Sequence, residues 1–132
     1  RRVLFRSTAA PSAPAAISTL RNVVIEMDDS MRFSPATVQA RVGEPLRFIV
    51  INQGKLPHEF VLGKEADLVA HAKDMQRAQA THHHHQNALS VKPGETGTLL
   101  WTFDQAGVWG VACFEPGHYA AGMRGEVRVS AK

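Results

Sequence analysis

The sequence predicts an all-β protein, an antiparallel sandwich of seven to eight short strands with one short helical insertion. Short runs rich in β-branched and aromatic residues recur along the chain, and turn-forming residues separate them about every ten positions. The stretch 65–80 differs, because it has neither Gly nor Pro and is rich in helix formers. The chain has 132 residues, which suits one domain with its own core.

Eight runs are expected to form strands, and the run 46–51 is apolar almost throughout, which is typical of a central strand. Gly, Pro, Asn and Asp mark the turns between the runs. The eight runs are residues 22–27, 37–42, 46–51, 58–62, 89–91, 97–103, 108–113 and 125–130. Three aromatic residues at strand spacing are expected in the core: Trp101, Phe103 and Trp109.

The stretch 65–80 is expected to be an amphipathic helix inserted between two strands. Leu68, Ala72 and Met75 recur at positions i, i+4 and i+7, which lie on one face of a helix. His71 and Met75 are one helical turn apart. Such a pair can bind a metal ion, although the same spacing more often places a Met in the core and a His at its rim.

The amino-terminal residues are expected to lie outside the domain. Residues 1–7 (RRVLFRS) resemble a translated sequencing adapter, and residues 8–19 are rich in Ala, Pro and Ser, which predicts a flexible lead-in. We therefore expect 1–21 to precede the domain and 22–132 to form it. Lead-ins of this composition often follow a cleaved signal peptide.

The composition excludes several classes of protein. The net charge is +3 with neutral histidines and no clustered Lys/Arg stripe, so nucleic-acid binding is not expected. No apolar run approaches the ~20 residues of a membrane span. The chain has one cysteine, Cys113, which rules out an intramolecular disulfide, a CxxC motif and a four-cysteine metal site.

One loop carries the side chains with the strongest chemical signal. Cys113, His118 and Met123 follow one another with four residues between each pair, and His58 comes after a predicted central strand. Two imidazoles and a thiolate with a weak axial thioether form a set that suits both oxidation states of copper. Zinc sites rarely recruit Met, so Met123 argues against zinc.

Each of these residues taken alone has an ordinary structural explanation. A lone Cys is usually a small buried hydrophobe, a lone His at a strand end usually lies on the surface, and a Met near the carboxyl terminus usually belongs to the core. Their joint occurrence favours copper, because the Cys ends a strand while the His and the Met follow on a Gly/Pro loop. The sequence therefore predicts a site for one copper ion.

The segment Cys113–Met123 (CFEPGHYAAGM) resembles the carboxyl-terminal ligand loop of the cupredoxins, the blue-copper proteins. Its PGH triplet resembles the azurin and auracyanin form, and the spacing of Asn52, Gly54 and the Pro57-His58 pair resembles the segment that carries the first histidine ligand. Within the family, the chain is most similar to periplasmic copper-tolerance cupredoxins of the CopI kind. These also have a PHEF-like segment, a helical insertion with a His and a Met, and an EPGHYxAGM-like loop.

The resemblance implies a Greek-key β-sandwich and a mononuclear type 1 copper site, blue or green. By position, His58, Cys113 and His118 match the three equatorial ligands and Met123 matches the axial one. Two positions depart from the common pattern. Glu59 stands where many cupredoxins have an Asn that ties the two ligand loops together, so that this tie is made differently or is absent. Phe114 stands where many have a small hydroxyl residue.

Further histidines and methionines raise the question of a second metal site. Four consecutive histidines follow the predicted helix, and they either form a solvated loop or bind a second ion together with His71 and Met75. The four are His82, His83, His84 and His85. Another loose group is expected to be a turn: Met27, Asp28, Asp29 and Met31.

Two functions are therefore open. The first is a redox carrier in the periplasm, whose electron port is His118 with Leu56, Tyr119 and Ala120 around it, and whose partner is a c-type cytochrome or a copper oxidase. The second is copper tolerance, in which the protein holds or oxidises Cu(I). A variant of the second is a copper-sequestering protein with extra His/Met sites and no dedicated redox partner.

An enzyme is not expected. Multicopper oxidases need several HxH pairs, copper nitrite reductases need a second domain, and a dinuclear electron-transfer centre needs two cysteines, which this chain lacks. We expect a monomer with one copper ion.

Overall fold

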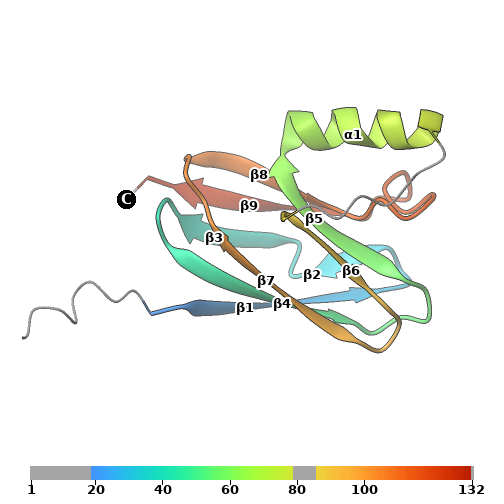
Figure 1. The fold of residues 1–132 in the computed structure, drawn as a ribbon, viewed down its shortest axis with the longest axis horizontal. Coiled ribbons are helices and arrows are strands. Elements are labelled where there is room, and N and C mark those ends of the chain that lie inside the picture. The colour runs from blue at the N-terminus through green and yellow to red at the C-terminus, as the bar shows by residue number, and fades with distance from the viewer. Residues whose placement is uncertain (1–18, 79–85, 132) are drawn as a thin grey trace, which may run out of the picture.

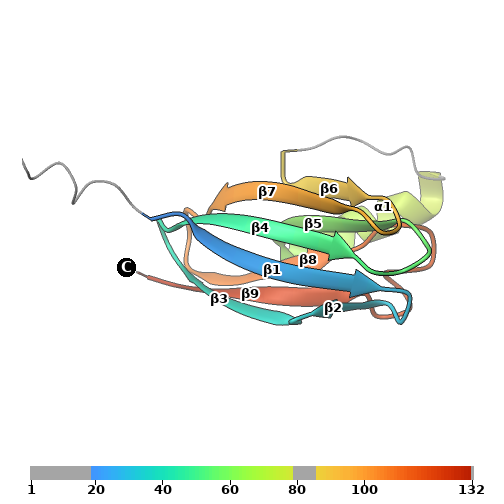
Figure 2. The same ribbon diagram turned by 90° about the horizontal axis from the view of Figure 1, so that it is seen from below.

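The computed structural model describes residues 19–78 and 86–131, and within the helix it describes side chains as far as Lys73. Two β-sheets pack face to face, and one helix lies beside them (Figures 1 and 2). The prediction of a β-sandwich with one helical insertion is confirmed. The elements in chain order are β1 (Arg21–Asp28), β2 (Arg32–Ser34), β3 (Thr37–Arg41), β4 (Pro45–Asn52), β5 (His58–Lys64), α1 (Glu65–Ala78), β6 (Ala88–Val91), β7 (Thr96–Thr102), β8 (Gly107–Ala112) and β9 (Arg124–Ser130).

The sheets are mixed, which corrects the expectation of a purely antiparallel sandwich. One sheet has the order β2-β1-β4-β7, and the other has the order β3-β9-β8-β5-β6. β1 pairs with β4 in parallel, and so does β3 with β9, while the other pairs are antiparallel. Strand periodicity cannot reveal these directions, because a strand alternates in the same way in either kind of pair. The short strand β2 was also not predicted; it pairs with β1 directly after the turn at residues 29–31.

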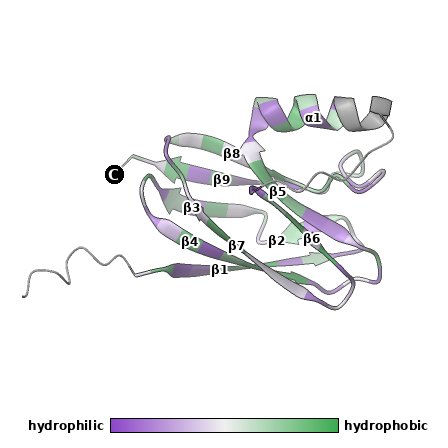
Figure 3. Cartoon of the chain, in the orientation of Figure 1, coloured by the Kyte–Doolittle hydropathy of each residue, from purple (hydrophilic) through white to green (hydrophobic). Residues whose placement is uncertain are grey.

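The core lies between the two sheets and follows from the alternation of side chains along each strand. β4 shows it most clearly: Leu46, Phe48 and Val50 are fully buried, whereas the residues between them are partly exposed. Hydrophobic and hydrophilic residues are correspondingly interspersed along the strands (Figure 3). Phe60 contacts Phe48, with ring centroids 5.3 Å apart, and thereby joins the two sheets. The predicted aromatic core is confirmed for Phe103 and Trp109, and Trp101 packs at its edge.

α1 covers the other side of the second sheet. β5 is buried on both faces, since Phe60 and Leu62 face the core while Val61 belongs to a second cluster with Leu68 and Ala72 of the helix. Leu68 lies directly over β8, where a Cβ on Gly110 would come within 2.5 Å of its side chain. The glycine therefore permits the close approach of helix and sheet. The structure describes the helix as far as Ala78, and the last two residues of the predicted stretch lie outside the described residues.

One end of the sandwich gathers the predicted ligand segments. The loop after β4, the start of β5, the end of β8 and the loop before β9 meet at the end opposite the carboxyl terminus (Figure 1). The turn after β1 lies at the same end.

Candidate metal centre

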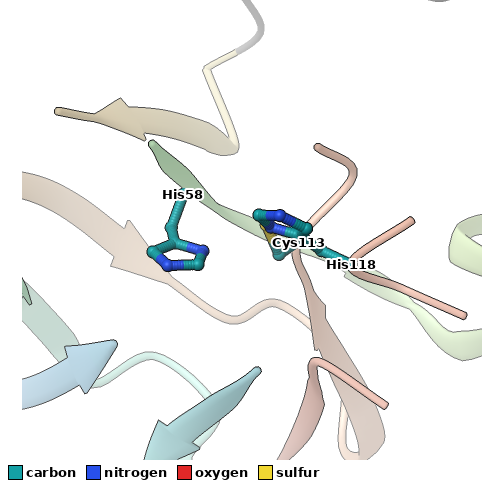
Figure 4. Close-up of side chains that lie close together, drawn as sticks. All are labelled: His58, Cys113 and His118. Atoms are coloured by element: carbon teal, nitrogen blue, oxygen red, sulfur yellow. The ribbon is translucent and has the colours of Figure 1, made fainter. Parts of the chain in front are cut away.

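The structure brings three of the predicted ligands together. One nitrogen or sulfur atom from each of His58, Cys113 and His118 lies within 4.8 Å of the others, although His58 is far from the other two in sequence. The side chains come from β5, from the residue after β8 and from the following loop (Figure 4). Within the described residues, this is the one group of three or more such donors.

Strand pairing brings the first histidine to the cysteine. β5 and β8 are antiparallel neighbours, with Val61 opposite Ala112, so the first residue of β5 lies near the residue that follows β8. The backbone N–H of Glu59 then donates a hydrogen bond to Sγ of Cys113 over 3.2 Å. The fold thus holds His58 and Cys113 side by side through the backbone itself.

The loop between Cys113 and Met123 folds into a tight turn that returns to its start. The N–H of Met123 donates to the carbonyl of His118 over 3.1 Å, and the N–H of Cys113 donates to the carbonyl of Met123 over 3.2 Å. Gly117 and Gly122 have φ angles of 83° and 103°, a region that residues with a Cβ rarely adopt. Met123 is fully buried, and the hydrogen bond to its carbonyl places its backbone next to that of Cys113.

The sulfur of Cys113 is buried and in contact with the second histidine. Nδ1 of His118 lies 3.4 Å from Sγ of Cys113, and Cys113 has no exposed surface. Burial raises the pKa of the Cys113 thiol to about 11, against an ordinary value of 9.0. The copper-free protein therefore holds a protonated thiol at neutral pH, and a bound metal ion must displace that proton.

We expect the Cys113 thiol of the copper-free protein to titrate near pH 11 rather than near 9.0. Because the raised pKa belongs to the folded state, the unfolded chain loses its proton first. The contribution of this group to the free energy of unfolding is therefore complete below about pH 9 and is lost as the pH rises toward 11. Ultraviolet absorbance of the thiolate checks this, and a band that grows near pH 9 in the folded protein would contradict it.

His58 presents Nδ1 as its free nitrogen, and Nδ1 of His118 is the nitrogen that lies beside the Cys113 sulfur. Nε2 of His58 lies 2.9 Å from Oδ1 of Asp29, whereas Nδ1 of His58 is buried with no hydrogen-bond partner. The imidazole rings are 4.9 Å apart. Burial and the neighbouring His58 lower the pKa of His118, which favours the neutral imidazole that binds metals. An orphaned buried nitrogen beside a buried thiol fits a soft metal ion.

Glu59 supplies the tie between the ligand loops that the sequence left open. Its side chain is buried, and Oε1 accepts a hydrogen bond from the N–H of Phe114 over 3.2 Å. Oε2 lies 3.5 Å from the hydroxyl of Ser90 on β6. A carboxylate therefore replaces the Asn that is common in cupredoxins, and it anchors the residue next to Cys113.

Two further residues support the site, although the sequence analysis gave neither of them a role in holding the ligands. Asn52 is fully buried, and its side chain donates to the carbonyls of Leu56 and Val91 while it accepts from the N–H of Gly54. This holds the segment that leads to His58. Asp29 lies in the predicted turn and contacts His58. Asn52 was used in the sequence analysis only as part of the segment that resembles the first-histidine region, and Asp29 only as part of an expected turn.

The structure does not test the predicted second site, because its side-chain description includes only one of the six predicted residues. His71 is half-buried and lies with its ring edge against Phe114, with centroids 4.7 Å apart. The side chain of Met75 and the residues His82, His83, His84 and His85 lie outside the described part of the structure. The prediction that these residues bind a second ion stays a prediction.

The donor set and the fold together define a class of protein. A thiolate and two imidazoles on one end of a β-sandwich, with a buried methionine beside them, form a mononuclear copper site of the type 1 kind. The chain belongs to the plastocyanin/azurin family of copper-binding proteins, whose model matches residues 21–130. Copper is its cofactor, and the cluster accommodates one ion.

Curated relatives within this family are copper-resistance proteins by name. The chain is 45% identical over 109 residues to the copper-resistant cuproprotein CopI of Rubrivivax gelatinosus, a match that covers 83% of this chain and 66% of the relative. It is 32% identical over 138 residues to CopI of Pseudomonas aeruginosa, covering 83% of this chain and 76% of the relative. The chain thus spans about two thirds of the length of the first relative.

A solved structure confirms the fold. Auracyanin from Roseiflexus castenholzii, crystallised in its dithionite-reduced form, superposes with a TM-score of 0.71 and 20% sequence identity, covering 82% of this chain and 95% of that one.

No helix among the described residues is long and apolar enough to cross a membrane.

Proposed function

We propose that the protein is a redox-active copper-tolerance protein of the periplasm, with a type 1 copper site and no catalytic turnover of its own. The observation that carries this is the convergence of His58, Cys113 and His118 within 4.8 Å at one end of the sandwich. The names of the CopI relatives support a role in copper resistance. The resemblance to periplasmic cupredoxins supports the compartment.

In this proposal, Nδ1 of His58, Sγ of Cys113 and Nδ1 of His118 are the equatorial donors, and the thioether of Met123 is the weak axial donor. Bound copper supplies one-electron chemistry between Cu(I) and Cu(II). The chain holds the donors in nearly one arrangement for both states, because buried backbone hydrogen bonds fix Cys113 on both sides. Little rearrangement is then needed when an electron arrives or leaves.

The proposed electron port is the edge of His118, which is the partly exposed member of the three. Leu56, in the segment before His58, is 43% exposed. Ala120, in the same loop as His118, is exposed as well. Tyr119 is half-buried between Phe114 and Arg124. An apolar rim of this kind suits brief docking of a redox protein such as a c-type cytochrome or a copper oxidase.

Copper sequestration without a dedicated redox partner is the second candidate. The histidine run at residues 82–85 favours it, since a single-copper carrier has no need of those side chains. A site with four ligands is filled by one ion, so any further ion must use other donors.

Copper stoichiometry separates the two candidates. Calorimetry is done on the wild type and on a variant in which His82, His83, His84 and His85 are all alanine. If both proteins bind one equivalent of copper tightly and exchange electrons rapidly with a cytochrome, the first candidate, a redox-active protein with a single copper ion, is supported. Additional tight equivalents that disappear in the variant support sequestration. A wild type that binds no copper tightly would refute both.

Replacement of Met123 by leucine is expected to keep the copper but to change its properties. The axial ligand tunes both the colour and the reduction potential of such sites. Loss of the thioether removes one electron donor, and this destabilises the more highly charged Cu(II) more than Cu(I). We therefore expect a shifted visible spectrum and a higher reduction potential. Spectroscopy and voltammetry check this, and identical values in the two proteins would show that Met123 is only a core residue.

A further inference from the structure

Asp29 makes a direct side-chain contact with the first histidine. It lies in the turn between β1 and β2, and its Oδ1 is 2.9 Å from Nε2 of His58. The His58 side chain is fully buried, while that of Asp29 is 35% exposed. The contact joins a carboxylate from one sheet to an imidazole from the other.

This contact decides which nitrogen of His58 is free. An acceptor at Nε2 requires the hydrogen on that atom, so that Nδ1 carries a lone pair. Nδ1 is the buried nitrogen without a partner, and the site of the other donors lies on its side of the ring (Figure 4). Asp29 thus selects the tautomer that a metal ion at the site needs.

The carboxylate of Asp29 is itself held from a second direction. Oδ2 accepts the N–H of Lys55 over 2.8 Å, and Oδ1 also accepts the N–H of Leu56 over 3.3 Å. The carboxylate thus contacts three nitrogens, the backbone N–H groups of Lys55 and Leu56 and the imidazole of His58. Gly54 makes room for it, since a Cβ there would lie 2.1 Å from Oδ1. The loop is therefore shaped around the carboxylate.

We propose that Asp29 is a positioning residue of the copper site: it fixes the tautomer and orientation of His58, and its negative charge favours the oxidised metal. The inference rests on the proposed role of His58 as a ligand. A carboxylate that accepts the other N–H of a ligating histidine raises the basicity of that histidine, and loss of such a partner typically costs 10–100-fold in metal affinity. Loss of Asp29 lowers the affinity for Cu(II) more than the affinity for Cu(I), because the higher charge of Cu(II) interacts more strongly with a basic ligand and a nearby anion.

Four variants separate the effect of Asp29 on the His58 tautomer from the effect of its negative charge. Asp29→Asn keeps an oxygen acceptor for Nε2 but removes the charge, and Asp29→Ala removes both. Gly54→Ala leaves Asp29 in the chain and displaces its carboxylate. Asp28→Asn is the matched control, because Asp28 loses the same charge one residue away while its hydrogen bonds go to Ser30 and not to His58.

The first measurement is the reduction potential of each copper-loaded protein. We expect Asp29→Asn to lower the ratio of Cu(II) to Cu(I) affinity about tenfold, which raises the potential of a one-electron couple by about 59 mV. Asp29→Ala and Gly54→Ala are expected to shift it at least as far, and Asp28→Asn much less. Equal shifts in Asp29→Asn and Asp28→Asn would overturn the proposal, since they would reflect only net charge.

The second measurement uses the copper-free protein and nitrogen NMR of the imidazoles. His58 is expected to carry its hydrogen on Nε2 in the wild type and in Asp29→Asn, and to become a mixture of tautomers in Asp29→Ala. A wild type with the hydrogen on Nδ1 would overturn the proposal. If the wild type showed no thiolate-to-copper band, the proposed function would fail; if it showed that band and Asp29 variants had unchanged potentials and tautomers, only this inference would fail.

Discussion

Replacing Cys113 by serine is expected to abolish the intense visible absorption of the copper-loaded protein. That absorption arises when a thiolate transfers charge to Cu(II), and a serine hydroxyl is a hard, weakly acidic donor that cannot do so. Cys113 is the sole cysteine of the chain, and its sulfur lies between the N–H of Glu59 and Nδ1 of His118. No other side chain can replace the lost thiolate.

The measurement is a visible spectrum after one equivalent of Cu(II) is added to the copper-free protein. Far-ultraviolet circular dichroism confirms that the variant is folded, as expected for an exchange of one small buried atom. His71→Ala is a control, because it changes a side chain that touches Phe114 and leaves the three converging donors intact. An intense band that survives in Cys113→Ser would rule out the proposed copper–thiolate bond.

Replacing Glu59 by alanine is expected to have the second largest effect. The buried N–H of Phe114 would lose its acceptor, and an unsatisfied buried donor costs about 1–3 kcal/mol in the free energy of unfolding. Phe114 follows Cys113 directly, so the ligand loop would also lose its anchor to β5. Partners of this kind typically contribute 10–100-fold to metal affinity.

Chemical denaturation and competitive copper titration measure the two effects of the Glu59 change. Glu59→Gln is the matched variant, since its amide oxygen still accepts from Phe114, and it should lie close to the wild type in both. Ser90→Ala removes only the weaker contact at 3.5 Å and should have a small effect. If the alanine and glutamine variants were alike, the hydrogen bond to Phe114 would not be what matters at this position.

The sequence alone was sufficient for the fold class and most of the elements. Runs of β-forming and apolar residues between turn signals predicted all the longer strands, and the Gly- and Pro-free stretch with apolar residues at helical spacing predicted α1, which the structure describes as far as Ala78. Both signals are local, because they depend on the period of side chains along one element. The strand β2 has three residues, too few for a period to be visible. The parallel pairs depend on which strands meet, and that is a property of the whole chain.

For the candidate site as well, the sequence predicted one part and the tertiary structure was needed for the other. Cys113, His118 and Met123 could be grouped from sequence because one short loop carries all three, and His58 could be added as a second imidazole after a predicted central strand, a position that the resemblance also supports. Only the tertiary structure decided which atoms surround them. Asp29 lies in a turn of the other sheet, and it reaches His58 because β1 and β4 run in parallel and end together.

What the sequence by itself determined is therefore the kind of donor and the kind of fold, since both follow from residue types and spacing along the chain. What only the tertiary structure decided is the environment of those donors: the orphaned Nδ1 of His58, the carboxylate tie of Glu59 and the raised pKa of Cys113. The physical reason is that burial and hydrogen bonding arise between segments distant in sequence, and they exist only after the two sheets have packed.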